Sequence, residues 1–157
     1  MHDVIIIGGG VTAFSAAMYC GRFQMKTLVL AGWQKGGVIV TTDDVSNYPG
    51  FKKLTGVELA QKIEEHARDY EIEVMEEKAD GVVKCGKAWE VSAGGKKLLA
   101  KTIIFATGSE VRKLGVPGEK ELANKGVSYC ALCDGPLFKN KVLAVIGGGD
   151  SAIKEAN

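Results

Sequence analysis

One glycine-rich turn near the start of the chain constrains the fold more than any other feature. The apolar run Asp3–Ile7 leads directly into Gly8-Gly9-Gly10, and Thr12–Arg22 then places small residues at helical spacing. A second short apolar run follows at Lys26–Leu30. Strand, turn, helix and strand in this order form a βαβ unit, whose right-handed crossover makes the two strands parallel. The chain is therefore expected to begin with an α/β domain built on a parallel sheet.

The same turn has the spacing of a dinucleotide-binding loop, Gly8-x-Gly10-x-x-Ala13. Gly8 permits the sharp turn, Gly10 lets the backbone approach a pyrophosphate, and Ala13 keeps helix and strand close. The N-terminus of the following helix favours the phosphate charge. The acidic residue that usually binds the ribose is absent, because Leu30-Ala31-Gly32-Trp33 occupies its place. The alternative is a glycine turn that packs two elements without a ligand.

The middle of the chain predicts a further helix and a small group of strands. Thr55 is expected as an N-cap, with Glu58 as its capping-box partner. Gly94-Gly95 is a hairpin signal. The strands are expected at Glu73–Met75, Gly81–Cys85, Ala88–Ser92, Lys97–Leu99 and Thr102–Ala106. These elements predict a small antiparallel β-meander joined to the parallel sheet.

A second strand, turn and helix begin near the end of the sequence. Lys141–Ile146 is an apolar run followed by Gly147-x-Gly149-x-x-Ala152, which repeats the dinucleotide spacing. Leu114–Gly118 contains glycines and a proline and is the best candidate for a domain boundary. A lone strand and a short helix cannot complete a parallel sheet, because the crossover must return to a neighbouring strand. We therefore expect the sequence to end inside a second α/β domain.

Between the two turns lies Cys130-x-x-Cys133-Asp134, a cysteine pair followed at once by an acid. A zinc site is disfavoured, because the other cysteines and histidines form no second pair of ligands. A thioredoxin-like domain is also disfavoured, because its pair follows the first strand. A dithiol coupled to a flavin fits best, with Asp134 carrying the proton of thiol–disulfide exchange and Gly135-Pro136 turning the backbone sharply.

Composition argues against several other classes of protein. The chain has 20 basic and 19 acidic residues among 157, which gives no reason to expect binding to nucleic acid or to a membrane surface. No run has the pattern of a leader or the length of a membrane span. The four cysteines are too few and too unevenly spaced for a disulfide framework, which predicts a cytoplasmic protein. Cys20 and Cys85 are expected to be buried, His66 to be solvated, and Trp33 to border a cofactor or anchor a loop.

These features together resemble the amino-terminal half of the low-molecular-weight thioredoxin reductase family, within the FAD-dependent pyridine nucleotide-disulfide oxidoreductases. The likeness runs from Asp3 to Asn157 in the right order. The motifs that carry it are Ile7–Tyr19, Gly36-Gly37, Asn47-Tyr48-Pro49-Gly50, Ala106-Thr107-Gly108, Cys130–Gly135 and Gly147–Ala152. The segment Cys-Ala-x-Cys-Asp-Gly before a second nucleotide turn is highly specific, whereas glycine motifs alone are not.

The resemblance implies a Rossmann-like FAD-binding domain over residues 1–113, a linker over 114–118, and the incomplete start of a Rossmann-like NADPH-binding domain over 119–157. It implies an enzyme, usually a homodimer, that passes electrons from NADPH through FAD to the dithiol and on to thioredoxin. Cys133 would be the sulfur nearer the flavin, Cys130 the interchange sulfur and Asp134 the acid/base. The residues that would contact FAD are Gly8, Gly10, Val11, Thr12, Gly37, Asn47, Thr107 and Gly108. Those that would contact NADPH are Gly147, Gly149, Asp150 and Ser151.

Two stretches depart from the family pattern, and alternatives stay open. Val11-Thr12-Ala13 stands where the family usually has Pro-Ala-Gly, and Val38 stands where a glutamine often follows Gly36-Gly37. A flavoprotein that reduces a peroxiredoxin, or a reductase driven by ferredoxin or a reduced deazaflavin, would share these motifs. An alternative of a different class is a non-catalytic, truncated nucleotide-binding fragment.

Overall fold

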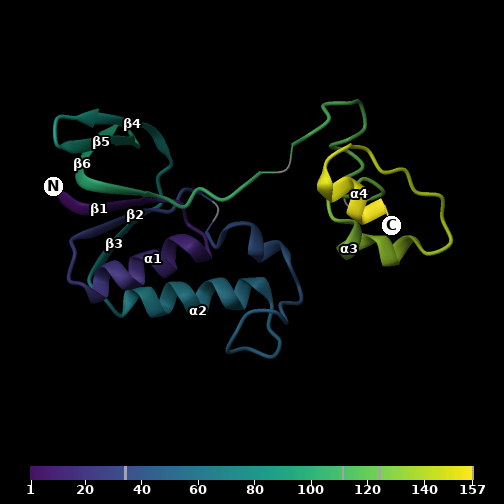
Figure 1. Ribbon diagram of the computed structural model, residues 1–157, viewed down its shortest axis with the longest axis horizontal. Helices are drawn as coiled ribbons and strands as arrows, with labels where there is room; N and C mark the ends of the chain where they lie inside the picture. The colour runs from purple at the N-terminus through teal and green to yellow at the C-terminus, as the bar shows by residue number, and fades with distance from the viewer. Residues whose placement is uncertain (34, 111, 124, 157) are drawn as a thin grey trace. The chain divides into compact units, whose positions relative to one another are not determined.

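The computed structural model describes residues 1–33, 35–110, 112–123 and 125–156, except for the side chains of Leu132 and Cys133. The chain divides into two compact units, Met1–Ser109 and Glu110–Asn157 (Figure 1). The domain limits predicted from the sequence lie a few residues further along the chain and stay a prediction.

The first unit is built on one sheet of six strands. The strands are β1 (His2–Ile7), β2 (Thr27–Leu30), β3 (Ile72–Met75), β4 (Ala79–Cys85), β5 (Ala88–Ala93) and β6 (Lys96–Phe105). They are ordered β3-β2-β1-β6-β5-β4 across the sheet. β1 pairs in parallel with β2 and β6, and β2 with β3, whereas β5 pairs antiparallel with β4 and β6. The predicted parallel sheet with an attached antiparallel meander is therefore confirmed.

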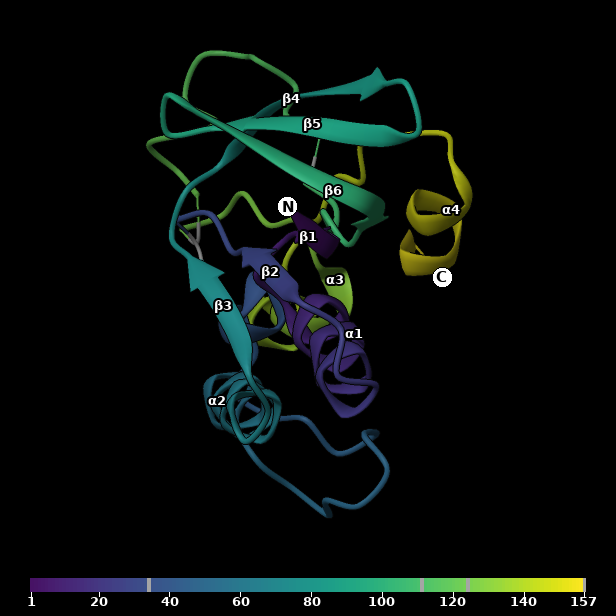
Figure 2. The same cartoon turned by 90° about the vertical axis from the view of Figure 1, so that its left-hand side faces the viewer.

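The first unit has three layers (Figure 2). Its helices are α1 (Val11–Arg22), α2 (Gly56–Arg68) and the short 3₁₀ helix η1 (Gly37–Thr41). On one face of the parallel strands, Phe14 of α1 packs in a buried cluster with Ile6 and Val29. On the other face, Ile5 shares a second buried cluster with Val91 of the meander. The parallel strands are thus covered on both faces, as a parallel sheet requires.

Strand β6 joins the parallel and antiparallel parts of the sheet. The sequence predicted two separate strands, Lys97–Leu99 and Thr102–Ala106, but the structure has one continuous strand over this region. Ala100 lies at the junction, where it pairs with both His2 of β1 and Trp89 of β5 and is fully buried. Because Ala100 pairs with both β1 and β5, the two predicted strands are joined into one.

The predicted start of α2 and the predicted hairpin are confirmed. The Glu58 N–H donates to Thr55 Oγ1 at 3.2 Å, and the Thr55 N–H donates to Glu58 Oε2 at 2.7 Å, which completes the capping box. Gly94 and Gly95 join β5 to β6 with φ of 53° and 72°. Two successive positive φ values are what a type I′ hairpin turn needs.

We expect Thr55→Ala to lower the free energy of unfolding by about 1 kcal/mol, because the Glu58 N–H loses its acceptor. Urea denaturation followed by circular dichroism measures this loss. Thr55→Ser keeps the hydroxyl and should stay close to the wild type. An equal loss in both variants would show that the hydroxyl does not stabilise α2.

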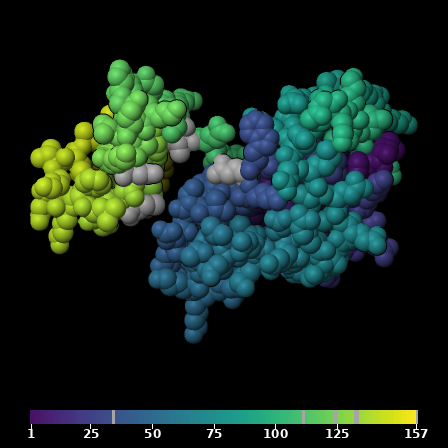
Figure 3. Space-filling view, turned by 180° about the vertical axis from the view of Figure 1, so that it is seen from behind, coloured from purple at the N-terminus to yellow at the C-terminus, as the bar shows by residue number. Residues whose placement is uncertain are grey.

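The second unit contains the short helices α3 (Ala131–Asp134), η2 (Gly135–Phe138) and α4 (Asp150–Ala156). The strand predicted over Lys141–Ile146 is wrong, because this segment is irregular. Val142 and Ile146 are exposed, and no described strand of this unit pairs with the segment. A strand needs a neighbouring ladder and a covered face, and this apolar run has neither among the residues that the structure describes. The unit forms the light green to yellow surface in Figure 3.

No helix in the described ranges combines the length and apolar character that a membrane span needs.

Candidate functional site

Three chain segments meet where the parallel strands of the first unit end. Ile7 at the end of β1 lies opposite both Leu30 and Phe105, so β1, β2 and β6 end at the same level. The backbone continues the pairing beyond the strands, since the Gly8 N–H donates to Leu30 O at 2.9 Å and the Ala106 N–H donates to Ile7 O at 2.8 Å. In open α/β sheets, ligands bind outside these carboxyl ends. The geometry therefore favours a ligand site here.

The first two glycines of the turn are required by the protein's own packing. Gly8 has φ of 135°, and a Cβ placed on it would overlap the Ala106 carbonyl oxygen and lie 2.6 Å from its carbon. A Cβ on Gly9 would overlap the Ala31 carbonyl oxygen in the same way. Gly8 thus does more than permit the turn, because it also lets the segment after β6 approach.

The third glycine is different. Gly10 has an extended backbone with φ of −93°, and a Cβ on it would meet no protein atom closer than Gly36 O at 3.5 Å. That distance is an ordinary van der Waals contact, so internal packing does not explain glycine at this position. A glycine here leaves the backbone open to the close approach of a phosphate.

The start of α1 has the properties of an anion site. Gly10 is its N-cap, no described side chain caps it, and its first turn contains no acidic residue. The backbone N–H groups of Val11, Thr12 and Ala13 therefore have no capping side chain to accept from them. These groups and the helix dipole favour a negative charge. Val11 and Thr12 begin this helix, and their contacts with FAD stay a prediction, while Ala13 is fully buried against the sheet as expected.

The other residues predicted to contact FAD lie in three loops. The Gly36 N–H donates to Gly9 O at 2.8 Å, and a Cβ on Gly37 would lie 3.2 Å from the Gly10 Cα, so these glycines lie beside the turn. The Thr107 backbone adjoins Gly8, and Gly108 follows with φ of 68°. Asn47 lies in the exposed loop between Val45 and Leu54. The structure brings Gly37 and the Thr107 backbone to the turn, and it shows no described contact between the turn and either Gly108 or Asn47.

The dithiol segment begins α3. Cys130 is disulfide-bonded and directly precedes this helix, and the Asp134 N–H donates to Cys130 O at 3.0 Å. The side chain of Cys133 lies outside the described residues, so the pairing of Cys130 with Cys133 stays a prediction. The sharp turn expected at Gly135-Pro136 is wrong, because the chain continues through them as η2. Proline fits there because the start of a helical turn needs no N–H from it.

Ser128 contacts both predicted catalytic residues that the structure describes. Its Oγ donates to Asp134 Oδ2 at 2.5 Å and accepts from the Cys130 N–H at 3.1 Å. The sequence interpretation did not select Ser128. A serine three residues before a helix is a signal for local side-chain to backbone hydrogen bonding, and the sequence contains that signal.

Glu119 is a second residue that the sequence interpretation missed. Its side chain is only 6% exposed, and its carboxylate accepts from the Leu114 N–H at 2.9 Å, the Gly115 N–H at 2.7 Å and the Tyr129 hydroxyl at 2.8 Å. Lys113 Nζ lies 4.5 Å from the centre of the Tyr129 ring. The hydrogen bond from the Leu114 N–H, followed by that from Tyr129, lowers the pKa of Glu119. Glu119 therefore links the backbone of Leu114 and Gly115 to Tyr129, which directly precedes Cys130.

The lowered pKa of Glu119 predicts a pH-dependent stability of this segment. A carboxyl group whose pKa is lower in the folded chain stabilises the fold above its unfolded pKa, and the effect is lost as the pH falls through the folded pKa. We expect Glu119→Gln to speed amide hydrogen exchange at Leu114 and Gly115 at pH 7, with the difference from the wild type shrinking below about pH 4. Glu121→Gln, at an exposed position, is the control. A difference that persists unchanged at acidic pH would contradict the role of the charge.

The second glycine turn begins with the same backbone angle as the first. Gly147 has φ of 141°, close to that of Gly8, and the Ile153 N–H donates to Gly149 O at 3.1 Å as α4 begins. Asp150 and Ser151 lie exposed in the first turn of α4, where Lys154 Nζ lies 2.8 Å from Asp150 Oδ2. The two turns thus share the φ of their first glycine, while the strand that should precede the second is absent from the described segment 141–146.

The remaining predictions had mixed outcomes. Cys20 is buried as expected, and burial raises the pKa of its thiol. Cys85 is exposed, so that prediction is wrong; it ends β4, the outermost strand, just before a tight turn. His66 is exposed as expected. Trp33 is 84% exposed and does not anchor its loop.

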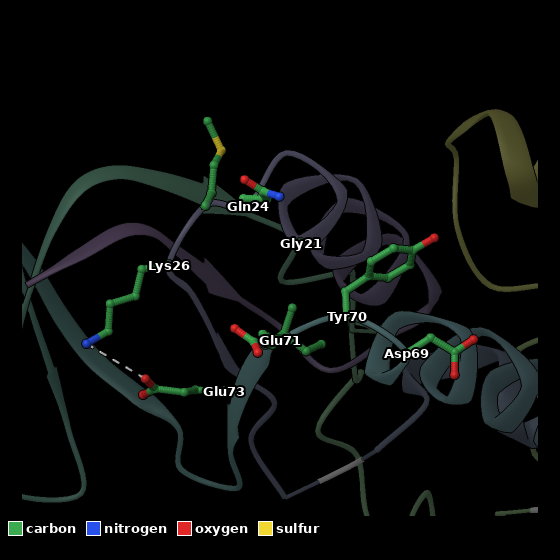
Figure 4. A pocket seen from close by; sticks show the side chains of 9 residues that line it. Gly21, Gln24, Lys26, Asp69, Tyr70, Glu71 and Glu73 are labelled. Carbon is green, nitrogen blue, oxygen red and sulfur yellow. Dashed lines mark ion pairs between the residues drawn. The ribbon is translucent and has the colours of Figure 1, made fainter.

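A pocket of about 860 Å³ lies at the opposite, amino ends of β2 and β3 (Figure 4). Its lining residues are Gly21, Gln24, Met25, Lys26 and residues 69–73. Lys26 Nζ lies 4.0 Å from Glu73 Oε1 across it, and both side chains are largely exposed. The described lining includes none of the site residues predicted from the sequence.

Comparisons with known proteins agree over the whole chain. The family model described as pyridine nucleotide-disulphide oxidoreductase matches residues 2–157. The chain is 47% identical over 156 residues to a thioredoxin reductase of Bacillus subtilis (strain 168), covering 99% of this chain and 49% of that protein. It is 45% identical over 157 residues to one of Mycolicibacterium smegmatis, covering 99% of this chain and 50% of that protein. The chain thus spans about half the length of the curated relatives it matches.

Solved structures give the same result. The Lactococcus lactis thioredoxin reductase, in a conformation named FR, matches with a TM-score of 0.77 at 42% identity, covering 99% of this chain and 52% of that one. A ferredoxin-flavin thioredoxin reductase from Clostridium acetobutylicum matches with a TM-score of 0.67 at 35% identity, covering 99% of this chain and 54% of that one.

Proposed function

This chain belongs to the pyridine nucleotide-disulphide oxidoreductase family, and on that premise we propose that the protein is an FAD-dependent thioredoxin-disulfide reductase driven by NADPH. One observation carries the proposal. A single chain combines a glycine turn at an uncapped helix N-terminus with a disulfide-bonded Cys130 that adjoins Asp134. The first element suits a dinucleotide phosphate, and the second suits thiol–disulfide exchange.

The residues of the first unit fit the proposed flavin nucleotide. Gly10 and the N–H groups of Val11 and Thr12 would hold the pyrophosphate, since internal packing neither requires the glycine nor caps the helix. The further FAD contacts that we propose are Gly8, Gly37, Asn47, Thr107 and Gly108. Bound FAD would supply the electron pair that opens the disulfide.

The second glycine turn is the proposed site of NADPH. Gly147 and Gly149 would approach the pyrophosphate, and Asp150 and Ser151 would line the start of the following helix. The backbone of Gly147 supports this assignment, because its φ of 141° matches that of Gly8.

The proposed chemistry of the dithiol conserves electrons and protons. Reduction of a Cys130–Cys133 disulfide takes up two electrons and two protons. The Cys130 thiolate then attacks the disulfide of thioredoxin, which forms a mixed disulfide and releases one thioredoxin thiolate. The Cys133 thiolate next attacks the Cys130 sulfur of this mixed disulfide, which restores the internal disulfide and releases the second thioredoxin thiolate. Asp134 would give a proton to each departing thiolate, because it lies in the same helical turn as Cys133.

We also propose the arrangement of the whole protein. Residues 1–113 would belong to the FAD domain, 114–118 to a linker, and 119–157 to the NADPH domain. Homodimerisation and a cytoplasmic location are part of the proposal. Support comes from the compact units found on either side of residue 109 and from the relatives named thioredoxin reductase.

The first test is to purify the full-length protein from its native cells and to record its visible absorption spectrum. The expected result is a flavin spectrum that bleaches with NADPH and recovers when oxidised thioredoxin is added. A protein without flavin and without turnover would overturn the proposal and favour a non-catalytic nucleotide-binding fragment.

The donor and acceptor are tested by substitution in the same assay. A ferredoxin-driven reductase is the second candidate, because one structural neighbour is named a ferredoxin-flavin thioredoxin reductase. Bleaching by reduced ferredoxin but not by NADPH would favour it. Turnover with a peroxiredoxin but not with thioredoxin would favour the peroxiredoxin-reducing alternative.

A further inference from the structure

Ser128 makes three hydrogen-bond contacts in the dithiol segment. Its Oγ lies 2.5 Å from Asp134 Oδ2, 3.1 Å from the Cys130 nitrogen and 3.2 Å from the Cys130 carbonyl oxygen. It thus lies between the backbone of the proposed interchange cysteine and the carboxylate of the proposed acid/base.

A serine hydroxyl has one proton, so it cannot donate to both oxygens at once. The Cys130 N–H donates to Ser128 Oγ in either case. With Asp134 ionised, the hydroxyl proton goes to the carboxylate, because a hydrogen bond to a charged acceptor is shorter and stronger. The distances agree, since Asp134 Oδ2 is closer than Cys130 O by 0.7 Å, the difference between 3.2 and 2.5 Å.

The Cys130 carbonyl oxygen can accept the serine proton when Asp134 is protonated. The protonated carboxyl group can donate to Ser128 Oγ, and the serine proton can then turn toward Cys130 O at 3.2 Å. Asp134 gains one proton, the serine keeps its own, and no group is left without a partner. The two contacts therefore correspond to the two protonation states of Asp134.

We propose that Ser128 is a positioning residue that holds Asp134 beside Cys130 in both protonation states by rotating its hydroxyl between them. The inference rests on the proposed function, in which Asp134 gives and takes the proton of disulfide exchange. Without Ser128, the carboxylate would lose its only described side-chain partner and its fixed place in the helical turn.

A second carboxylate contacts α3, and its effect must be distinguished from that of Ser128 on Asp134. Glu155 of α4 accepts from the Ala131 N–H at 2.8 Å. It binds the backbone of α3 and makes no described contact with Ser128 or Asp134. Glu155→Ala removes this acceptor and therefore tests whether loss of any carboxylate contact to α3 gives the same result.

The test uses flavin-loaded protein and separates its half-reactions by rapid mixing. Ser128→Ala should lower kcat for thioredoxin about tenfold while KM and the rate of flavin reduction by NADPH change less than about twofold. Ser128→Thr, which keeps a hydroxyl, should restore most of kcat. Ser92→Ala, in β5 of the first unit, is the matched control. Equal kcat in Ser128→Ala and wild type, or no rescue by threonine, would overturn the inference.

A double-mutant cycle distinguishes positioning from a purely structural role. If Ser128 acts through Asp134, then Ser128→Ala should have no further effect on kcat in an Asp134→Asn background. Additive losses would contradict the inference, even where Ser128→Ala alone lowers the yield of folded protein.

A last measurement keeps this inference apart from the proposed function. Reduction of the Cys130 disulfide by dithiothreitol, followed by alkylation and mass spectrometry, needs neither flavin nor thioredoxin. It should be several-fold slower in Ser128→Ala than in the wild type and in Ser128→Thr. If reduction by dithiothreitol is slower in Ser128→Ala but the protein does not turn over thioredoxin, the proposed substrate is rejected and the role of Ser128 is kept. Equal rates in all three proteins would reject the role of Ser128 itself.

Discussion

Gly8→Ala is expected to destabilise the first unit by about 3 kcal/mol or more and to abolish flavin binding. Gly8 has φ of 135°, which disfavours any side chain, and the added Cβ would overlap the backbone of Ala106. Because backbone cannot rotate away as a side chain can, either β6 or the turn must move. Urea denaturation and the flavin absorbance of the purified variant measure the two effects.

Gly81→Ala is the matched control for this prediction. Gly81 lies in β4, its φ is not positive, and a Cβ on it would meet nothing within 4 Å. This variant should stay within about 1 kcal/mol of the wild type and keep its flavin. If Gly8→Ala behaved like Gly81→Ala, the close packing of the three segments at the carboxyl ends of the strands would be refuted.

Cys130→Ser and Cys133→Ser are each expected to reduce thioredoxin turnover about a thousandfold or more, because the two sulfurs act as one unit. The two variants should differ in whether they form a mixed disulfide with thioredoxin. Cys133→Ser leaves the proposed interchange thiol, so it should form a stable mixed disulfide with thioredoxin that gel electrophoresis detects. Cys130→Ser should form much less of this adduct.

Cys85→Ser provides the control, because Cys85 is exposed at the end of β4 and belongs to no predicted site. Its turnover should equal that of the wild type. Full activity in Cys133→Ser would reject the dithiol mechanism. A stable adduct in Cys130→Ser instead of Cys133→Ser would reverse the two assigned roles.

Much of the first unit could be predicted because its signals are local. The run of β-branched residues before Gly8, and the pairing of Thr55 with Glu58, each fix one element without reference to distant residues. The spacing of the glycine turn predicted the close packing of Ala13, but not the approach of Ala106 to Gly8. The break predicted inside β6 was wrong, because Ala100 belongs to two ladders and only the folded sheet shows it.

The errors arise where the outcome depends on tertiary neighbours. Lys141–Ile146 has the composition of a buried strand, but composition cannot supply the strand beside it. Cys85 was expected to be buried from the average behaviour of cysteine, and the edge position of β4 exposes it. Glu119 was overlooked because a glutamate near glycine and proline is usually solvated. Its burial depends on Tyr129, ten residues later.

The likeness between the backbones of Gly8 and Gly147 bears on how the nucleotide loops form. The first follows a paired strand and the second follows an irregular segment, yet both adopt the same left-handed bend. A paired strand before the turn is therefore not required for this backbone angle, because the glycine itself permits it. A side chain at the first glycine should thus disturb either turn, whatever segment precedes it.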